Sequence, residues 1–178
     1  MTQMRRLQRA AVVCHLAERL RAADSWCGET HMQKAAFLLE AARDVPLEHE
    51  FVLYKYGPFS FDLRDELDEL RARGFLKLEP QSYPYGPRIG VTRRGPRLLD
   101  QHPKTVASYA EQVDDVVDFV GSRGVSALER LATAVYLVRR DPDASDDTLA
   151  EQLCEIKPHV TPTAAADAIA RARSFVAI

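Results

Sequence analysis

Apolar residues recur every three or four positions over most of this chain, which is the period of an α-helix. A first helix is predicted over residues 5–23, with arginines along its polar side. A second is predicted in HMQKAAFLLEAAR, with Thr30 as its N-cap and Pro46 just beyond its end. Its apolar side consists of Met32, Ala35, Ala36 and Leu39. We therefore expect the chain to open with two helices.

In the middle of the chain the apolar residues no longer follow the helical period throughout. EFVLYKY is rich in β-branched and aromatic residues and predicts a short strand. Gly57 and Pro58 break it in YGPFS, because glycine adopts backbone angles closed to other residues and proline fixes its own. A third helix follows, capped by Ser60 or Asp62 and ended by Gly74. Its single apolar stripe is formed by Phe59, Leu63, Leu67 and Leu70.

Two alternating segments, FLKLE and RIGVT, flank the loop PQSYPYGP and predict a β-hairpin with a wing-like tip. Beyond about residue 100 the pattern predicts about four more helices. The predicted fold class is mainly α with a small β-hairpin (α+β). Because the order helix, helix, strand, helix, hairpin is typical of a winged helix, we expect a winged-helix-like domain over residues 1–100. Residues 101–178 are expected to form a C-terminal helical segment that packs on this core or builds a homodimer seam.

Length and composition narrow the class of protein. The chain has 178 residues, which is long enough to bury a core without disulfides. Its net charge of −2 argues against a protein that coats nucleic acid. Its three cysteines, Cys14, Cys27 and Cys154, form no CxxC pair, although Cys27 lies in a turn where its thiol could be exposed. The apolar run near the N-terminus is too short to cross a membrane. We expect a cytoplasmic protein without a membrane partner.

Motifs of catalysis and of cofactor binding are missing from the sequence. It contains no glycine-rich phosphate loop, no HExxH or GxSxG motif and no histidine pair at metal-ligand spacing. We therefore expect no cofactor, no metal site and no enzymatic activity.

The third predicted helix occupies the position that usually enters the DNA major groove in a winged helix. Between residues 60 and 73 it carries five acids and only three arginines. The acids are Asp62, Asp65, Glu66, Asp68 and Glu69. Affinity for DNA comes largely from Lys and Arg that neutralise phosphates, so these acids as a group argue against DNA recognition by this helix. Individually, each is also explained as a solvated residue that complements the helix dipole.

The predicted wing carries the basic and aromatic residues. Its second strand is flanked by Arg88, Arg93, Arg94 and Arg97, which could contact nucleic acid, dock an acidic protein, or form a solvated strand end. Tyr83 and Tyr85 lie at the wing tip. Exposed tyrosines beside arginines are typical of protein interfaces.

The segment MQKAAFLLEAA, followed by FVLYKYGPFSFDLRDELDELRARGFL, resembles the Panacea-type (DUF4065) family of bacterial and phage-associated proteins. The resemblance covers mainly residues 28–95, with a weaker similarity over residues 145–175. It implies an antitoxin that binds its cognate toxin directly and has no catalytic role. It also implies that the matching motif positions determine the fold. These positions are Gln33, Lys34, Tyr56, Gly57 and Pro58.

Two hypotheses follow from the sequence. The first is a non-catalytic protein-binding module, most simply an antitoxin-like protein, with an interface on the third helix and the wing. The residues expected in this interface are Arg64, Asp65, Asp68, Tyr83, Tyr85 and Arg88. The alternative is a winged-helix transcriptional regulator that contacts DNA through the wing and its arginines.

Overall fold

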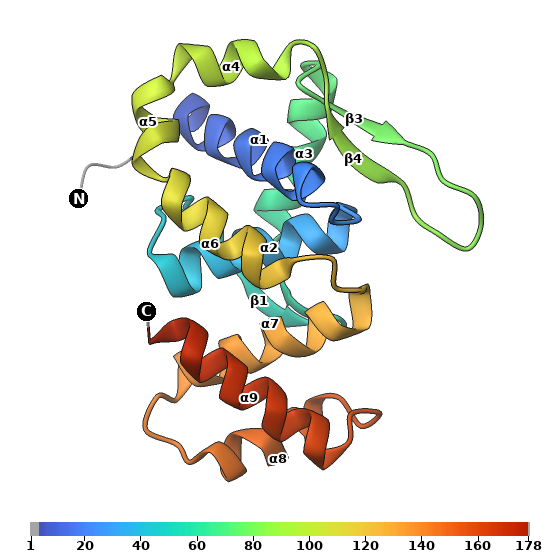
Figure 1. Ribbon diagram of the computed structural model, residues 1–178, viewed down its shortest axis with the longest axis vertical. Coiled ribbons are helices and arrows are strands. Elements are labelled where there is room, and N and C mark those ends of the chain that lie inside the picture. The colour runs from blue at the N-terminus through green and yellow to red at the C-terminus, as the bar shows by residue number, and fades with distance from the viewer. Residues whose placement is uncertain (1–3, 178) are drawn as a thin grey trace.

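A computed structural model describes residues 4–177, and within this range the chain forms nine helices and four short strands (Figure 1). The mainly α fold with small β-hairpins is thereby confirmed. The helices are α1 (Arg6–Ala22), α2 (Glu29–Arg43), α3 (Phe61–Ala72), α4 (Gly95–Gln101), α5 (Pro103–Ser108), α6 (Ala110–Val120), α7 (Val125–Arg140), α8 (Asp146–Ile156) and α9 (Pro162–Val176). The strands are β1 (Val52–Tyr54), β2 (Gly57–Phe59), β3 (Leu76–Glu79) and β4 (Arg88–Val91).

The strands pair as two separate antiparallel hairpins. In the first, Val52 lies opposite Phe59, and Tyr54 lies opposite Gly57. The sequence predicted a lone strand ending at the Tyr-Gly-Pro turn, and this was wrong. Gly57 adopts φ +94 and turns the chain back at once, so that residues 57–59 pair with the preceding strand. The β1–β2 hairpin therefore stands apart from the predicted wing.

The third helix and the wing follow their predicted pattern. The hydroxyl of Ser60 caps α3 by accepting the backbone N–H of Leu63 at 3.2 Å. The leucines of the stripe are buried, whereas Phe59 lies in β2 and not in the helix. Gly74 follows the helix with φ +74. The hairpin β3–β4, called the wing below, then projects from the body of the molecule (Figure 1).

The connection between α1 and α2 differs from its prediction. Helix α2 begins at Glu29 after the N-cap Gly28, so Thr30 lies inside the helix and does not cap it. The thiol of Cys27, expected to be exposed, is fully buried, and burial raises its pKa to about 12. The reason is that the wing covers this turn, with the N–H of Ile89 donating to the carbonyl of Cys27 at 2.7 Å.

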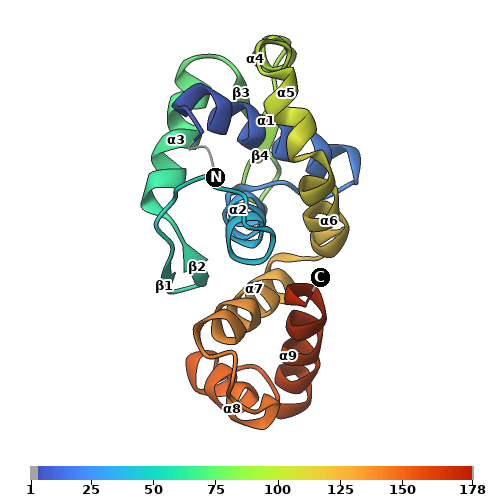
Figure 2. The same ribbon diagram turned by 90° about the vertical axis from the view of Figure 1, so that its left-hand side faces the viewer.

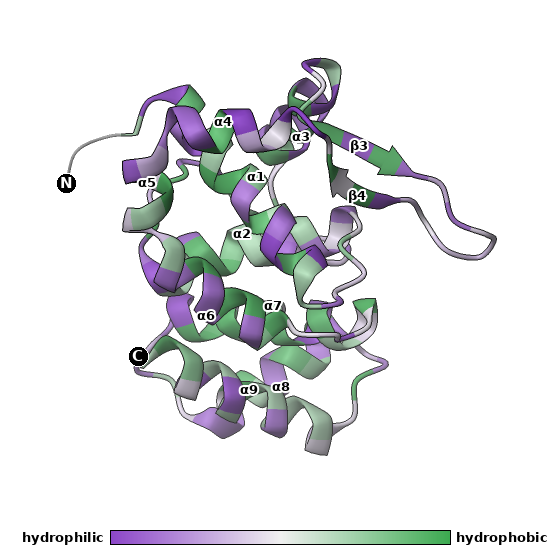
Figure 3. Cartoon of the chain, turned by 45° about the horizontal axis from the view of Figure 1, so that its top comes forward, coloured by the Kyte–Doolittle hydropathy of each residue, from purple (hydrophilic) through white to green (hydrophobic). Residues whose placement is uncertain are grey.

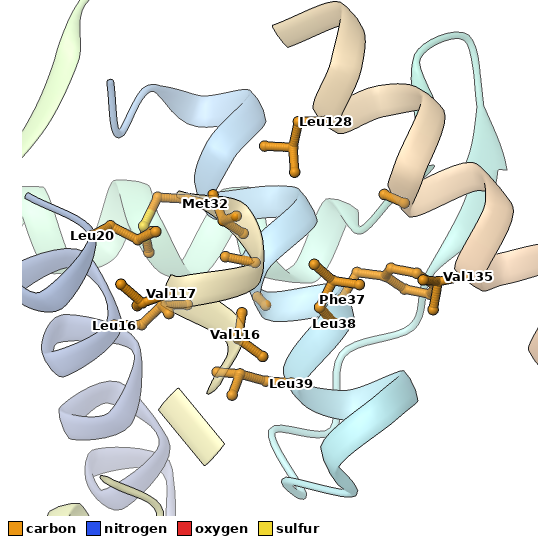
Figure 4. Packing of buried hydrophobic residues seen from close by; sticks show 14 of the residues in the cluster. Leu16, Leu20, Met32, Phe37, Leu38, Leu39, Val116, Val117, Leu128 and Val135 are labelled. Carbon is orange, nitrogen blue, oxygen red and sulfur yellow. The ribbon is translucent and has the colours of Figure 1, made fainter. Parts of the chain in front are cut away.

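Helix α2 lies at the centre of the core. Its residues from 31 to 39 are all buried, so apolar side chains occupy more than one side of the helix. Leu16 and Leu20 of α1 approach it from one side, and Leu128 and Val135 of α7 from another (Figure 4). Hydrophobic residues are correspondingly frequent where α2, α6 and α7 meet (Figure 3). A central helix of this kind requires partners for each polar side chain that it carries.

Within residues 4–177, six helices follow the wing, and five of them begin beyond residue 100, where the sequence predicted about four. Helices α5 and α6 are separate, because the chain leaves the helical conformation at Tyr109. Helices α7, α8 and α9 form a lower layer in Figure 2, and α7 packs against α2. The hydrophobic core thus continues across residue 100.

The last helix is fastened to the core near its end. The ring of Phe175 stacks on Phe119 of α6 with 3.9 Å between the centroids. The guanidinium of Arg43 lies 3.9 Å from the Phe175 ring centroid and donates to the Phe175 carbonyl at 2.8 Å.

Residues 4–177 include no helix with the combined length and apolarity that a bilayer span requires.

Candidate functional site

Two polar side chains of α2 hold the end of the β1–β2 hairpin. Gln33 is fully buried, and its side-chain amide makes two hydrogen bonds to the backbone of Ser60. The Gln33 Oε1 accepts the Ser60 N–H at 2.9 Å, and the Gln33 Nε2 donates to the Ser60 carbonyl at 2.8 Å. Lys34 donates from Nζ to the carbonyl of Pro58 at 3.0 Å. The structure thus brings together four of the five motif positions, and Tyr56 remains exposed at the hairpin tip.

Gly57 lies against α7 at a distance that leaves no room for a side chain. A Cβ atom built on it would come within 2.7 Å of the Thr133 Oγ1. That hydroxyl is fixed, because it donates to the Glu129 carbonyl one turn earlier at 2.7 Å. Thr133 and Glu129 were not singled out from the sequence, since nothing local marks residues so far along the chain as neighbours of a turn.

A buried cluster of charges surrounds the Lys34 amine. Burial lowers the pKa of Lys34 from 10.5 to about 8, against the opposing effect of Glu129. Burial also raises the pKa of the Glu129 carboxyl, which Lys157 and Lys34 oppose. The Lys157 Nζ lies 3.8 Å from the Glu129 Oε2. Since Lys34 is 2% exposed and bonded to Pro58, its amine is out of reach of a substrate and acts to position the hairpin.

A groove of about 370 Å³ separates α3 from the wing and reaches the start of α2. Its apolar surface comes from Trp26, Leu67, Leu78, Ile89 and Val125. Charged residues stand beside this surface, among them Arg64, Asp68 and Arg71 on α3. Two of the residues predicted to form an interface, Arg64 and Asp68, therefore lie in one groove together with the wing. Trp26 and Val125 were missed, because their place in the groove depends on tertiary packing.

The wing side of the groove is built on Trp26. The ring of Tyr85 packs on the Trp26 ring with 5.0 Å between the centroids, and Tyr85 remains exposed. Arg88 donates to the backbone carbonyls of Trp26 and Ser25, each at 3.0 Å. These hydrogen bonds fasten the wing to the turn before α2. The structure thus assigns Arg88 a positioning role within the chain, and its predicted contact with a partner stays a prediction.

The remaining predicted contact residues of the wing tip and of the segment after β4 are exposed. Tyr83 is 97% exposed at the tip of the wing. Arg93, Arg94 and Arg97 are exposed where β4 leads into α4, and within residues 4–177 they make no ion pair. The guanidinium of Arg94 lies 5.8 Å from the Phe75 ring centroid. None of these three arginines lines the groove between α3 and the wing.

A second, smaller hollow lies on the other side of α3, and Asp65 lines this hollow together with Glu66 and His49. Asp65 is therefore separated from the groove that contains Asp68. The imidazole of His49 bridges two glutamates, with Nδ1 2.8 Å from the Glu40 Oε1 and Nε2 2.7 Å from the Glu66 Oε2. Burial lowers the pKa of His49, but the hydrogen bonds and charges of Glu40 and Glu66 outweigh it and raise the pKa to about 9.

The raised pKa of His49 predicts that the protein loses the stabilisation from this residue in alkaline solution. The folded chain keeps a proton on His49 that the unfolded chain releases above pH 6.5, so the stabilisation is complete below about pH 6.5 and is lost as the pH rises through about 9. The shift corresponds to about 3 kcal/mol of unfolding free energy. We expect the stability difference between the wild type and His49→Gln, measured by urea unfolding, to shrink steadily from pH 6 to pH 10.

The difference between the two proteins is the quantity to follow, because Lys34 has the opposite pH dependence. Its pKa is lowered in the folded chain, so its cost to stability is relieved as the pH rises above about 8. Both proteins contain Lys34, and its contribution cancels in the difference. A difference that stays constant between pH 6 and pH 10 would show that His49 is not held as an imidazolium.

No family model matches the chain, and no curated protein matches it in sequence. The resemblance to the Panacea-type family therefore stays a prediction that rests on the motif residues.

Proposed function

We propose that this protein is a non-catalytic, cytoplasmic protein-binding module that neutralises a partner toxin by direct binding. The groove between α3 and the wing is its proposed binding surface. The observation that carries this proposal is the combination of an apolar groove surface with charged residues from two elements, Glu29 on α2 and the charged residues of α3. Such an arrangement is typical of protein interfaces, where an apolar centre is surrounded by polar residues. The motif resemblance supplies the antitoxin role.

The exposure of the acids on α3 favours a protein partner over DNA. The side chains of Asp65 and Asp68 are 72% and 62% exposed. If α3 entered a major groove, these carboxylates would face phosphates and repel them. A protein partner with lysines or arginines would instead gain from the same charges.

We expect Asp68→Lys to weaken the complex with the partner at least tenfold, because Asp68 lines the groove. Asp65→Lys should have a smaller effect, because Asp65 lines the second hollow and not the groove. The measurement is the Kd of the purified complex by isothermal titration calorimetry, after the partner has been captured from native lysate with the tagged full chain. The matched control is Asp143→Lys, which makes the same charge change at an exposed aspartate in the α7–α8 loop.

Three results would contradict the proposal. Equal binding by Asp68→Lys and the wild type would remove the groove from the interface. A weakening by the control variant as large as that by Asp68→Lys would show that only net charge matters. Capture of DNA from one locus, lost on nuclease treatment and without a protein, would favour the alternative function.

That alternative is a winged-helix DNA-binding regulator, and the exposed arginines at positions 93, 94 and 97, which make no ion pair within the described residues, favour it. A DNA contact through these three arginines would not need the acidic side of α3. DNA binding through them would weaken steeply with salt.

A further inference from the structure

An exposed cluster of aromatic rings lies where the β1–β2 hairpin meets α3. Tyr54 is 56% exposed and Phe61 is 45% exposed, although both side chains are large and apolar. Their ring centroids are 5.8 Å apart, and the Phe59 ring lies 5.9 Å from Tyr54 and 5.1 Å from Phe61. Val52, also exposed, lies opposite Phe59 in the hairpin and extends the cluster. A contiguous exposed apolar patch of this kind marks an interaction surface.

The cluster is continuous with the groove along one side of α3. Residues three or four apart on a helix are neighbours, so Phe61 and Arg64 lie one turn apart on the side that leads to Asp68. The Arg64 guanidinium lies 5.2 Å from the Phe61 ring centroid, and Arg64 also lines the groove. Arg64 therefore joins the two surfaces.

The charges around the cluster are mostly acidic. Glu50 and Asp62 lie at its edge, where the Asp62 Oδ2 accepts the Glu50 N–H at 3.4 Å, and both side chains are exposed. Asp65 follows Phe61 by one turn of α3. The nearby bases are Lys55, whose Nζ lies 5.2 Å from the Tyr56 ring centroid, and Arg64, which already pairs with Asp65 at 3.2 Å.

These charges select among the possible occupants. A second copy of this chain in a twofold dimer would bring the same acids face to face, which is repulsive. A partner segment that carries lysines or arginines around an aromatic or aliphatic side chain would complement both the acids and the rings. Aromatic residues dominate the energy of such contacts.

We infer that the Tyr54–Phe59–Phe61 cluster is the docking point for a basic segment of the protein partner, which places an aromatic or aliphatic anchor residue on the rings. This inference rests on the proposed function and names the chemistry of the partner. The bound segment extends from the rings past Arg64 into the groove beside Asp68.

The test uses a displayed library of random 12-residue peptides, selected on the full-length wild type and counter-selected on Tyr54→Ser/Phe61→Ser. We expect the enriched peptides to combine Lys or Arg with an aromatic or aliphatic residue. Synthetic peptides from this pool should bind at least tenfold more weakly to Tyr54→Ser and to Phe61→Ser. The matched control is Ile156→Ser, which removes an exposed apolar side chain at the end of α8 and should leave the Kd within twofold.

Circular dichroism establishes that each variant is folded, and Tyr54→Ser serves alone if Phe61→Ser is not. Enrichment of acidic peptides, enrichment of no peptide, or equal binding by the wild type and the serine variants would overturn the inference. Dimerisation of the wild type that these variants abolish would overturn it as well, since the occupant would then be a second copy.

The native complex separates this inference from the proposed function. Loss of partner affinity in Asp68→Lys with full affinity in the two serine variants would leave the function standing and overturn the docking point. Capture of no protein partner would count against the function, and the peptide selection would still decide the chemistry of the aromatic cluster.

Discussion

Gly57→Ala is expected to lower the free energy of unfolding by about 2–5 kcal/mol. The left-handed backbone conformation at φ +94 costs an L-residue about 1–2 kcal/mol. The added methyl group would lie 2.7 Å from the Thr133 Oγ1, and overpacking of a buried contact costs about 1–3 kcal/mol more. Urea unfolding followed by circular dichroism measures the loss.

Gly86→Ala is the matched control for this substitution. Gly86 lies in the wing loop, where an added Cβ would meet no heavy atom within 4 Å. Its effect should stay within about 0.5 kcal/mol. Thr133→Ala removes the hydroxyl that the new methyl would meet, so Gly57→Ala should cost less in that background. A loss for Gly57→Ala no larger than that for Gly86→Ala would mean that the hairpin is not packed on α7 as described.

Gln33→Leu is expected to lower the free energy of unfolding by roughly 2–4 kcal/mol. Leucine has a similar size, so the change removes hydrogen bonds without opening a large cavity. The Ser60 N–H would be left buried without a partner, which costs about 1–3 kcal/mol. The Ser60 carbonyl would lose one of two hydrogen bonds, because it also accepts the Arg64 N–H at 3.2 Å.

The control for Gln33→Leu is Gln101→Leu, which makes the same chemical change at the exposed end of α4. That variant should be within about 0.5 kcal/mol of the wild type. Equal stability of the two variants would refute the claim that the Gln33 amide holds the hairpin. In hydrogen exchange, the Ser60 amide should lose protection in Gln33→Leu and keep it in Gln101→Leu.

Local sequence signals predicted much of the fold. The stripe of Leu63, Leu67 and Leu70 predicted α3, and its cap and glycine stop are those observed. The alternation in FLKLE and RIGVT predicted both arms of the wing. These elements were predictable because their apolar residues face one neighbour each, so that the period of the pattern matches the period of the structure.

Elements that depend on their surroundings were less predictable. Strand β2 consists of Gly-Pro-Phe, a poor strand sequence, and it forms because Lys34 and Gln33 hold it. The candidate site could likewise be predicted from the sequence only in part. The sequence singled out Arg64, Asp68 and the motif pair Gln33–Lys34, but it could not show that Trp26 and Val125 complete the groove, since these residues meet α3 only after the chain has folded.

The contacts that Phe119 and Arg43 make with Phe175 have a practical consequence for protein engineering. Removing the last helix would uncover the Phe119 ring and leave the Arg43 guanidinium without its stacking partner and without the carbonyl that it bonds. A shortened variant made to map a binding surface would then expose a new apolar patch and bind other proteins for the wrong reason. Point substitutions on the intact chain avoid this artefact, and an affinity tag at this end needs a flexible spacer that leaves the Phe175 stack undisturbed.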